Sequence, residues 1–399
     1  MGWLRRGLVA VSAFVLFWPL AGYPAVLWLI GRLRGRSSAP QPSDVLPSMT
    51  VIVPTYMERA NIKARLENIA ECRYPPGRLE IMVVDSASSD GTADAADEYA
   101  TAHPQQNVRV LREPVRAGKA AATNFALRHA SGELILVTDA PTRFHPAALA
   151  FIASNFGDPK IGAATGRFDV FEQRTATQRE EGLFWRIRNV LRTLEADVDS
   201  TPFLSGEFCC FRRRLVDHID ADTIADDMNV AIGVRRAGYR SIVDARALFS
   251  EPRSPDVGDL LIRKVSRAAG GIQELLRNRD MMLRREYGLY GMLILPSDLL
   301  YYLPLRVPAL AVVGAACMGK LKRGHPALWL AAALPLAVPN LRRKMADAAY
   351  VIALNEWLFV RGWQTVLAGK TEVLWEKESR EVVPDAAWDQ PGYARGSDA

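Results

Sequence analysis

The stretch VIVPTYMERANI, residues 51–62, opens the part of the chain that decides the fold. A β-branched run at residues 50–53 predicts a strand, and a helical stretch at residues 59–71 follows it. The same alternation recurs three times downstream. Further strands are predicted at residues 80–84, 108–111 and 133–138, and further helices at residues 92–100, 119–129 and 146–156. Strands that alternate with helices in this way predict an α/β domain with a mainly parallel sheet.

Polar residues follow three of these strands at their carboxyl ends. Pro54, Thr55 and Tyr56 follow the first strand, Asp85 follows the second and Asp139 follows the fourth. In open sheets of this kind, ligands bind at the carboxyl ends of the strands. One aspartate at a strand end can simply form a turn or cap a helix, but here three polar ends converge on one edge. The sequence therefore predicts a ligand site at that edge.

The composition limits the class of protein. Of 399 residues, 49% are hydrophobic and 24% are charged, and the formal net charge is +6. This balance argues against a disordered chain and against a fully membrane-embedded transporter. The positive excess is too diffuse to indicate nucleic acid, but it suits anionic lipid headgroups or a phosphorylated substrate. The four cysteines show no metal-ligand spacing, which indicates a reduced domain that faces the cytosol.

An apolar stretch without a charge occupies residues 7–31 and is long enough to cross a hydrocarbon core of about 30 Å. Pro19 and Pro24 are expected to kink this helix. A secretory signal peptide has a shorter apolar core and a small-residue cleavage site. We therefore interpret the stretch as a retained membrane anchor.

Apolar sequence returns in the last third of the chain. Residues 288–318 are long enough to span a membrane, although Asp298 and Arg306 lie within them. Residues 325–339 are short for a crossing, and residues 348–369 carry charges that suit a helix in the membrane interface. The number of C-terminal crossings stays open at this point: two with an interfacial helix, or three.

These segments predict five parts of the chain. They are a transmembrane anchor at residues 1–36, a Ser/Pro-rich linker at 37–48, the α/β domain at 49–283, a C-terminal membrane region at 284–369 and a tail at 370–399.

Five segments together resemble family 2 glycosyltransferases, which have the GT-A fold. VIVPTYMERANI resembles their opening PxYNE-type segment, and VVDSASSDGT at residues 83–92 resembles their nucleotide segment VVDDGSxDGT. GKAAATNFAL at residues 118–127 resembles a GKaxAlNxgl stretch, and ILVTDAPTRFHP at residues 135–146 lies where the DxD metal motif belongs. ADDMNVAIGVRRAGYR at residues 225–240 resembles the segment that carries the catalytic base. The resemblance extends over residues 49–282.

The resemblance implies a bacterial, membrane-anchored, inverting enzyme with a GT-A domain between N- and C-terminal transmembrane helices. It would move a sugar from a nucleotide-diphosphate donor, expected to be a UDP-sugar, to a lipid-linked or saccharide acceptor in envelope glycan or glycolipid synthesis. Since that donor is made in the cytosol, we expect a multi-pass protein of the inner cell membrane whose catalytic domain faces the cytoplasm. Membrane lipids are then partners, and nucleic acid is not.

By the same resemblance, Asp227 is the general base and Asp226 is the acid that tunes or orients it. Asp139 would hold Mg²⁺ or Mn²⁺, which would act as a Lewis acid on the departing diphosphate. The sequence departs from the family at Pro141, which stands where the motif has its last acid. Either Asp139, phosphates and waters suffice for the metal, or the metal site is weakened.

The nucleotide-sugar site implied by the resemblance combines the strand-end residues with neighbouring loops. Two of its members have a simpler alternative. Asp90 could serve merely as a helix cap, and Lys119 could merely be solvated. The full set is Pro54, Thr55, Tyr56, Glu58, Asp85, Asp90, Lys119 and Asp139.

The acceptor side is the least specific part of the resemblance. Ser205, Gly206 and Glu207 lie where relatives place an acceptor wall. Arg263, Lys264 and Arg267 could neutralise a diphosphate or face lipid phosphates. Processive synthases carry a tryptophan near the last three, and this chain has none there. Two alternatives stay open: a processive exopolysaccharide synthase, and a degenerate transferase that acts as a membrane scaffold.

Overall fold

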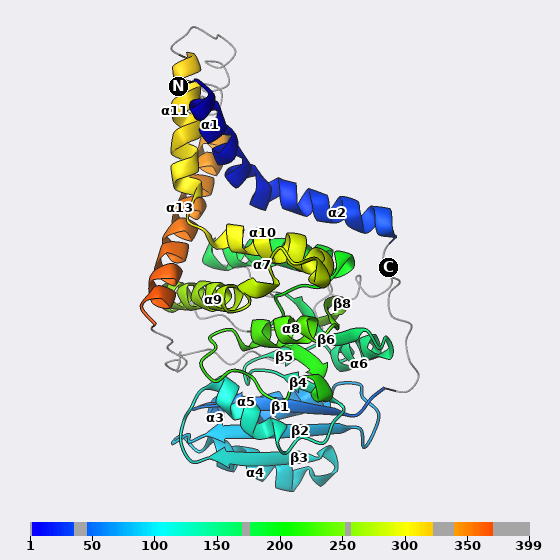
Figure 1. Cartoon of the computed structure of the whole chain (residues 1–399). Coiled ribbons are helices and arrows are strands. Elements are labelled where there is room, and N and C mark those ends of the chain that lie inside the picture. Colours follow the sequence, from blue (N-terminus) through cyan, green and yellow to red (C-terminus); the bar gives the residue numbers. More distant parts are fainter. Residues whose placement is uncertain (1, 36–45, 170–175, 252–256, 322–338, 370–399) are drawn as a thin grey trace.

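Strand β1 (Met49–Thr55) lies in the middle of the sheet and is buried along almost its whole length. It pairs in parallel with β2 (Leu79–Ser86) on one side and with β4 (Leu134–Val137) on the other. β2 pairs in parallel with β3 (Val108–Glu113). The computed structural model, shown in Figure 1, describes residues 2–35, 46–169, 176–251, 257–321 and 339–369.

The second half of the sheet is mixed. β7 (Cys209–Arg212) runs antiparallel to both β4 and β6 (Ile161–Phe168), and β6 runs parallel to β8 (Arg240–Ser250). The short β5 (Arg143–Phe144) closes the far edge, antiparallel to β8. Within the described residues, the strand order of this eight-stranded sheet is β3-β2-β1-β4-β7-β6-β8-β5. The α/β fold with a mainly parallel sheet is therefore confirmed.

Helices cover both faces of the sheet. α3 (Arg59–Ala70), α4 (Thr92–Ala102) and α6 (Ala148–Ser154) contribute to one hydrophobic core, and α5 (Lys119–Leu127) and α8 (Asp226–Arg236) contribute to the other. The four strands and four helices predicted up to residue 156 are all present, with ends shifted by a few residues.

The sequence of β1 explains why both faces must be covered. Val51 and Val53 pack into the first core, and Ile52 packs into the second, because successive side chains of a strand point to opposite faces. All three are fully buried. A run of β-branched residues without polar alternation is typical of a strand with helices on both sides.

A buried arginine supports the loop after β4. Arg65 on α3 has no exposed surface, and its guanidinium lies 3.8 Å from the centre of the Phe144 ring. It donates hydrogen bonds to Thr138 Oγ1 and to the carbonyl oxygen of Thr142, each at 2.8 Å. These two residues flank Asp139, so Arg65 fixes the backbone that presents this carboxylate.

A helical layer separates the sheet from the terminal helices (Figure 1). It consists of α7 (Ala176–Val198), α9 (Val257–Arg277) and α10 (Leu295–Tyr302). Residues of this layer form a third hydrophobic core with Tyr23 and Leu27 of the N-terminal helix, both of which are buried. The predicted anchor is therefore packed directly onto this helical layer.

The terminal helices form a stalk beside this layer. α1 (Gly2–Phe17) lies along α11 (Arg306–Leu321) and α13 (Pro339–Leu367), as Figure 1 shows. A π-helical turn at Trp18–Gly22 joins α1 to α2 (Tyr23–Arg34), and the chain changes direction there. Pro19 and Pro24 stand at this turn, where the sequence predicts a kink.

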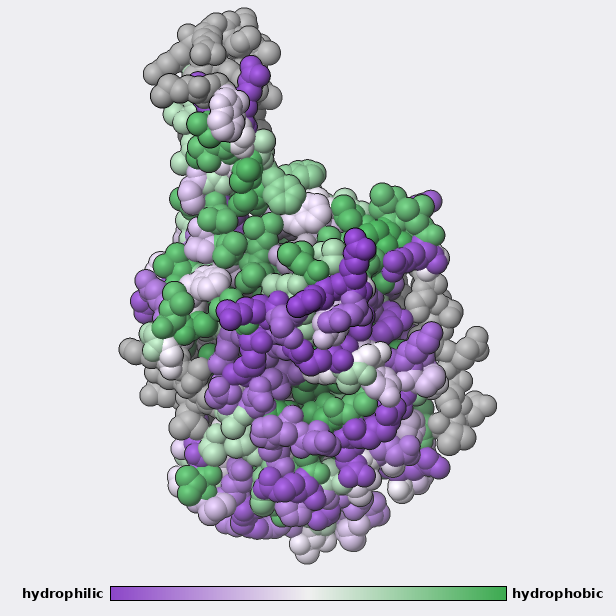
Figure 2. Space-filling model, in the orientation of Figure 1, coloured by the Kyte–Doolittle hydropathy of each residue, from purple (hydrophilic) through white to green (hydrophobic). Residues whose placement is uncertain are grey.

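The apolar surface follows the terminal helices. Figure 2 shows hydrophobic residues over the stalk and over α2, whereas the α/β domain below is mostly hydrophilic. Among the described residues, one helix, Trp3–Arg34, is long and apolar enough to cross a membrane. Tyr290–Tyr302 and Arg306–Ala316 reach that length only together, and they meet at an angle of 82°. Most of the predicted linker, the tail and most of the predicted segment 325–339 lie outside the described residues.

The role of Arg65 can be tested by substitution. Arg65→Met keeps an unbranched side chain but leaves Thr138, Thr142 and Asn68 without their buried partner. Each buried polar group left without its partner costs about 1–3 kcal/mol, so we expect the midpoint of thermal unfolding to fall by roughly 5–10 °C. The measurement is a thermal melt of the full chain in detergent.

Lys63→Met on the same helix is the matched control, because Lys63 is exposed. We expect this substitution to leave the midpoint nearly unchanged. Equal melting of the two variants would contradict a supporting role for Arg65.

Candidate active site

A pocket of about 1010 Å³ opens at the carboxyl ends of β1 and β4. This volume is at the upper end of the range for ligand pockets, roughly 300–1,000 Å³, and leaves room for two substrates. Its lining includes the end of β1, the start of α5, the loop after β4, the loop before β7, the start of α8, and α9. Segments far apart in sequence therefore meet in one cavity.

The ammonium group of Lys119 joins several of these segments. Gly118, with φ +97°, precedes α5 in a conformation that a side chain would strain, and Lys119 begins the helix. Lys119 Nζ lies 2.7 Å from Asp139 Oδ1 and 3.8 Å from Asp226 Oδ2. It also donates a hydrogen bond to the carbonyl oxygen of Gly206 at 2.8 Å. Burial alone would lower the pKa of Lys119, but Asp139 and Asp226 outweigh it and raise that pKa above its usual value.

Asp226 and Asp227 occupy the first turn of α8, where the helix dipole favours carboxylates. Asp227 Oδ1 accepts a hydrogen bond from the backbone N–H of Met228 at 2.9 Å. Desolvation in the pocket wall, together with the charges of Asp226 and Glu207, raises the pKa of Asp227 to about 7. A carboxyl group with this pKa can accept a proton at neutral pH and is suited to general base catalysis.

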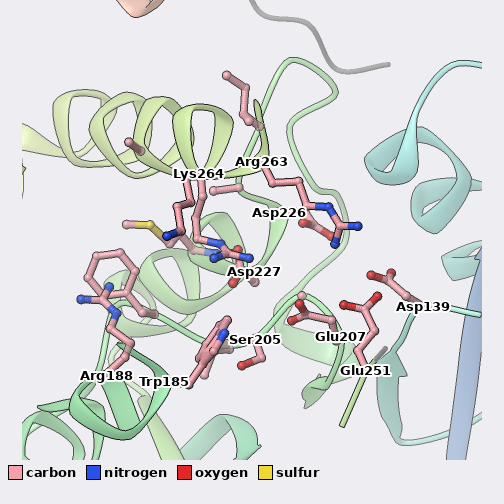
Figure 3. A pocket seen from close by; sticks show the side chains of 18 of the residues that line it. Asp139, Trp185, Arg188, Ser205, Glu207, Asp226, Asp227, Glu251, Arg263 and Lys264 are labelled. Atoms are coloured by element: carbon pink, nitrogen blue, oxygen red, sulfur yellow. The ribbon is translucent and has the colours of Figure 1, made fainter. Parts of the chain in front are cut away.

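Two further carboxylates face Asp139. Figure 3 shows Asp139, Glu207 and Glu251 pointing toward one another across the pocket. Both glutamates line the pocket, and Glu251 follows the end of β8 and is buried. Glu207 belongs to the stretch that the sequence places at the acceptor wall, although the sequence predicts no separate role for it. No local pattern in the sequence points to Glu251.

The wall of the pocket predicted to face the acceptor is held by α7. Arg192 is almost fully buried and donates a hydrogen bond to Ser205 Oγ at 2.8 Å. Burial and the nearby Arg188 lower the pKa of Arg192 to about 10, so it stays charged at neutral pH. Trp185 and Arg188 of the same helix line the pocket beside it (Figure 3). The predicted wall residues Ser205 and Gly206 both line the cavity.

The nucleotide side of the pocket contains an unsatisfied buried oxygen. Asp85 is buried, and its Oδ2 accepts a hydrogen bond from the backbone N–H of Ser88 at 3.0 Å. Its Oδ1 has no hydrogen-bond partner among the described residues, and an unpaired buried acceptor is costly. The guanidinium of Arg116 stacks 3.8 Å from the centre of the Tyr56 ring. The stack offers a flat surface to a planar base, and Asp85 stands next to Ser86, which lines the cavity.

The backbone of this side is strained. Met57 and Ala87 both have positive φ, +58° and +56°, which is uncommon outside glycine and asparagine. The backbone N–H of Met57 donates to Ser88 Oγ at 2.8 Å, which ties the two loops together. Strained residues of this kind cluster at functional sites.

Asp90 lies outside the pocket that the other predicted residues line. Its Oδ1 accepts a hydrogen bond from the backbone N–H of Thr92, at the start of α4, at 3.0 Å. Its Oδ2 accepts one from the backbone N–H of Arg59, at the start of α3, at 3.1 Å. Asp90 therefore performs the helix-capping role that the sequence allowed as an alternative.

The remaining predicted residues divide in the following way. The pocket is lined by Pro54, Thr55, Tyr56, Glu58, Lys119, Asp139, Ser205, Gly206, Asp226, Asp227, Arg263, Lys264 and Arg267. Asp85 is buried next to the lining residue Ser86 rather than exposed to the cavity. Arg267 of α9 lies 5.2 Å from the centre of the Trp185 ring, so a tryptophan from α7 stands beside the basic residues of α9.

The side chains near Asp139 fit a divalent cation held mainly by substrate. Within the described part of the chain, no group of three His, Cys, Asp or Glu side chains is arranged to hold a metal on its own. Mg²⁺ and Mn²⁺ sites commonly use one or two carboxylates together with phosphates and waters. Asp139 is 30% exposed and has a second oxygen beyond the one paired with Lys119. It could serve as such a carboxylate, although Pro141 offers no oxygen.

Comparison with known proteins agrees with this geometry. Residues 50–220 match the family model described as "Glycosyl transferase family 2". Poly-beta-1,6-N-acetyl-D-glucosamine synthases of Staphylococcus epidermidis and of Staphylococcus aureus strain COL are 24% and 25% identical over 280 residues. In each case the alignment covers 66% of this chain and 66% of the relative, so the chain matches just under two thirds of the relative's length.

A solved structure is similar over most of the chain. It is the mannosyltransferase PcManGT from Pyrobaculum calidifontis in complex with GDP-Man and Mn²⁺. The two are 29% identical with a TM-score of 0.68, over 91% of this chain and 99% of the other. The likeness includes the helices outside the family match. Residues 50–220, which contribute Lys119, Asp139, Ser205 and Gly206 to the pocket, therefore carry the match to glycosyl transferase family 2, and the fold is consistent with GT-A.

Proposed function

We propose that this chain is a membrane-anchored, inverting glycosyltransferase that uses a nucleotide-diphosphate sugar and a lipid-linked or saccharide acceptor in envelope glycan or glycolipid synthesis. One observation carries the proposal. Asp227, whose pKa is raised to about 7, lines the same cavity as the Lys119–Asp139 pair. A base and a diphosphate site within one pocket are what sugar transfer from such a donor requires.

In this proposal the donor lies across β1 and β4. Asp85 and the Tyr56–Arg116 stack hold the nucleobase, and Lys119 approaches the diphosphate. Ammonium groups bind phosphate as compact point charges, and positive charge at the leaving group stabilises the transition state. UDP is the nucleotide expected from the sequence, and the GDP-Man bound by PcManGT makes GDP the alternative to test.

A divalent cation fits the same place, with Asp139 as the protein carboxylate that would hold it. When bound, Mg²⁺ or Mn²⁺ supplies positive charge to the leaving diphosphate. The Mn²⁺ in PcManGT supports this assignment.

In the proposed reaction, the acceptor hydroxyl lies beside Asp227. Its oxygen attacks the anomeric carbon, the bond from that carbon to the diphosphate oxygen breaks, and the nucleoside diphosphate leaves with the electron pair. The hydroxyl proton passes to the Asp227 carboxylate. Attack from the face opposite the leaving group inverts the anomeric configuration. Asp226 and Glu207 keep Asp227 basic through their negative charge.

We further propose that the α/β domain, residues 49–283, faces the cytoplasm at the inner cell membrane. The N-terminal helix anchors it, and the C-terminal helices α11 and α13 complete a multi-pass membrane region. The apolar surface of the stalk supports this arrangement, as does the similarity to PcManGT over 91% of the chain.

A processive synthase is the second candidate function. The poly-beta-1,6-N-acetyl-D-glucosamine synthases among the relatives favour it. It predicts a long polymer as the product, whereas the first proposal predicts the addition of a single sugar. Analysis of product length with labelled donor distinguishes the two.

Asp227→Asn tests the proposed base. Because asparagine cannot accept the proton, we expect kcat to fall by roughly 10²–10⁴-fold while the Kd for the nucleotide changes little. Transfer is measured with labelled UDP- and GDP-sugars and membrane lipids. Asp217→Asn is the matched control, since Asp217 is exposed and does not line the pocket. Full activity in Asp227→Asn would remove Asp227 from the mechanism.

The pH dependence of kcat tests the raised pKa. The base must be ionised, so activity is lost as pH falls through the pKa of Asp227, about 7. Glu207→Gln removes one of the charges that raises this pKa, and we expect the acid limb to move to lower pH by about half a unit. Glu98→Gln, an exposed residue on α4, should leave the profile in place. A rate that is flat between about pH 5 and 9 would contradict the assignment.

Nucleotide titration separates an active transferase from a degenerate scaffold. We expect UDP or GDP to bind, and Mn²⁺ to tighten this binding by about tenfold or more in the wild type but not in Asp139→Asn. Binding is measured calorimetrically with each nucleotide, with and without Mn²⁺. If neither nucleotide binds under any condition, the result favours a degenerate scaffold and contradicts the transferase proposal.

A further inference from the structure

The pocket extends well beyond the carboxylates, toward the terminal helices. At this end it is lined by apolar and aromatic side chains from four helical segments: Pro19 and Leu20 of the π-helical turn, Ile187 of α7, Tyr302 of α10, and Leu358 and Phe359 of α13. We refer to these six residues as the apolar arm. The catalytic carboxylates and the apolar arm belong to one continuous cavity.

The helices that form the apolar arm also carry the apolar outer surface of the molecule. Leu20 is 69% exposed and Ile187 is 61% exposed, although both line the cavity. Figure 2 shows that the hydrophobic surface covers the stalk and α2. Part of the apolar arm comes from a helix long enough to cross a membrane. Its apolar lining favours a hydrocarbon chain over a sugar polymer as the occupant.

Basic residues of the helical layer line the same cavity as the apolar arm and the carboxylates. Arg263, Lys264 and Arg267 of α9 and Arg188 of α7 all line the cavity. Figure 3 shows Lys264 and Arg188 on the side of Asp227 away from Asp139. The guanidinium of Arg188 lies 3.6 Å from the centre of the Phe203 ring, and burial, which would lower its pKa, is outweighed by neighbouring acidic groups. These four residues form what we call the basic step.

Figure 1 places the helical layer that carries the basic step between the sheet and the terminal helices. An amphiphile with a phosphate between its sugar and its hydrocarbon chain matches this arrangement. Guanidinium and ammonium groups bind phosphate oxygens well, and burial of a hydrocarbon chain in an apolar site favours binding.

The proposed base, Asp227, restricts which group of the amphiphile can react at the carboxylate end of the cavity. A phosphate monoester is already largely ionised at neutral pH, since its second pKa is about 6, and needs no base to become a nucleophile. A hydroxyl group does need one. Asp227, with its pKa near 7, therefore matches a hydroxyl acceptor rather than a bare lipid phosphate.

We infer that the acceptor is a lipid-linked saccharide joined to its chain through phosphate. Its hydroxyl lies at Asp227, its phosphate contacts the basic step and its hydrocarbon chain occupies the apolar arm. This inference rests on the proposed function and specifies its acceptor. In the reaction the acceptor O–H is lost, a C–O bond to the sugar forms, the donor's bond to diphosphate breaks, and the phosphate link to the lipid stays intact.

The binding of a simple lipid phosphate tests the inference without catalysis. Decyl phosphate carries both the charge and the chain, whereas decanol lacks the charge and inorganic phosphate lacks the chain. With the full chain in nanodiscs, we expect decyl phosphate to bind at least about tenfold more tightly than either control. Decanol binding as tightly as decyl phosphate would overturn the assignment of the basic step.

Substitutions in the arm locate the site. We expect Leu20→Trp and Leu358→Trp each to weaken decyl phosphate binding by about tenfold, because the larger side chain fills the arm. Leu33→Trp is the matched control on the N-terminal helix, since Leu33 is 77% exposed and does not line the cavity. Leu20 is itself exposed, so its variant remains informative if Leu358→Trp does not fold. Unchanged binding in Leu20→Trp and in any folded Leu358→Trp would overturn the inference.

Two additional measurements make the result specific. Competition of decyl phosphate by farnesyl phosphate or by lysophosphatidic acid shows whether an isoprenoid or a glycerolipid is the better occupant, and either result supports a lipid phosphate site. Titration with UDP and GDP in the same preparation tests the donor site separately. Nucleotide binding without decyl phosphate binding would refute the acceptor inference alone, and the reverse would refute the proposed transferase.

Discussion

The geometry of the site depends on one ammonium group that is held between two carboxylates. Lys119 pairs with Asp139 after β4 and with Asp226 at the start of α8, and it also bonds the Gly206 carbonyl before β7. Side chains this shielded from water need charged partners, because an unpaired charge in such a place is expensive. Lys119 therefore fixes segments that are up to about a hundred residues apart, before any substrate is bound.

The same charges that build the pocket also set its chemistry. Burial and the carboxylates of Asp226 and Glu207 raise the pKa of Asp227, which makes it a better proton acceptor near neutral pH. Lys119 opposes this effect and limits it. In the proposed reaction, Lys119 attracts the anionic diphosphate and Asp227 accepts the proton of the acceptor. The pocket thus has a positive group and a basic carboxylate as neighbours, as this reaction requires.

Much of the fold followed from local sequence, whereas parts of the site did not. The runs around Val51–Val53 are apolar on both faces, so strands and their covering helices could be predicted. Asp139 and Asp227 were found because each ends or begins an element within a recognisable segment. For Asp90 the sequence left open a nucleotide contact or a helix cap, and the structure shows that it bonds the backbone at two helix starts.

Other site residues have no local signature, because tertiary packing alone brings them to the pocket. Glu251 reaches the cavity at the end of the long strand β8, and Arg116 reaches it by stacking on Tyr56. The sequence has no tryptophan beside the basic residues of α9, yet α7 places Trp185 there. The bend of 82° between Tyr290–Tyr302 and Arg306–Ala316 likewise divides a stretch that looked like a single crossing.

The most direct test of the central claim is an experimental structure of the full chain with a bound donor nucleotide and Mn²⁺. The account predicts a diphosphate in contact with Lys119 Nζ, a base on the Tyr56 side within reach of Asp85, and Asp227 facing the open space beyond the diphosphate. A nucleotide bound elsewhere on the molecule, or Asp227 turned away from that space, would contradict it.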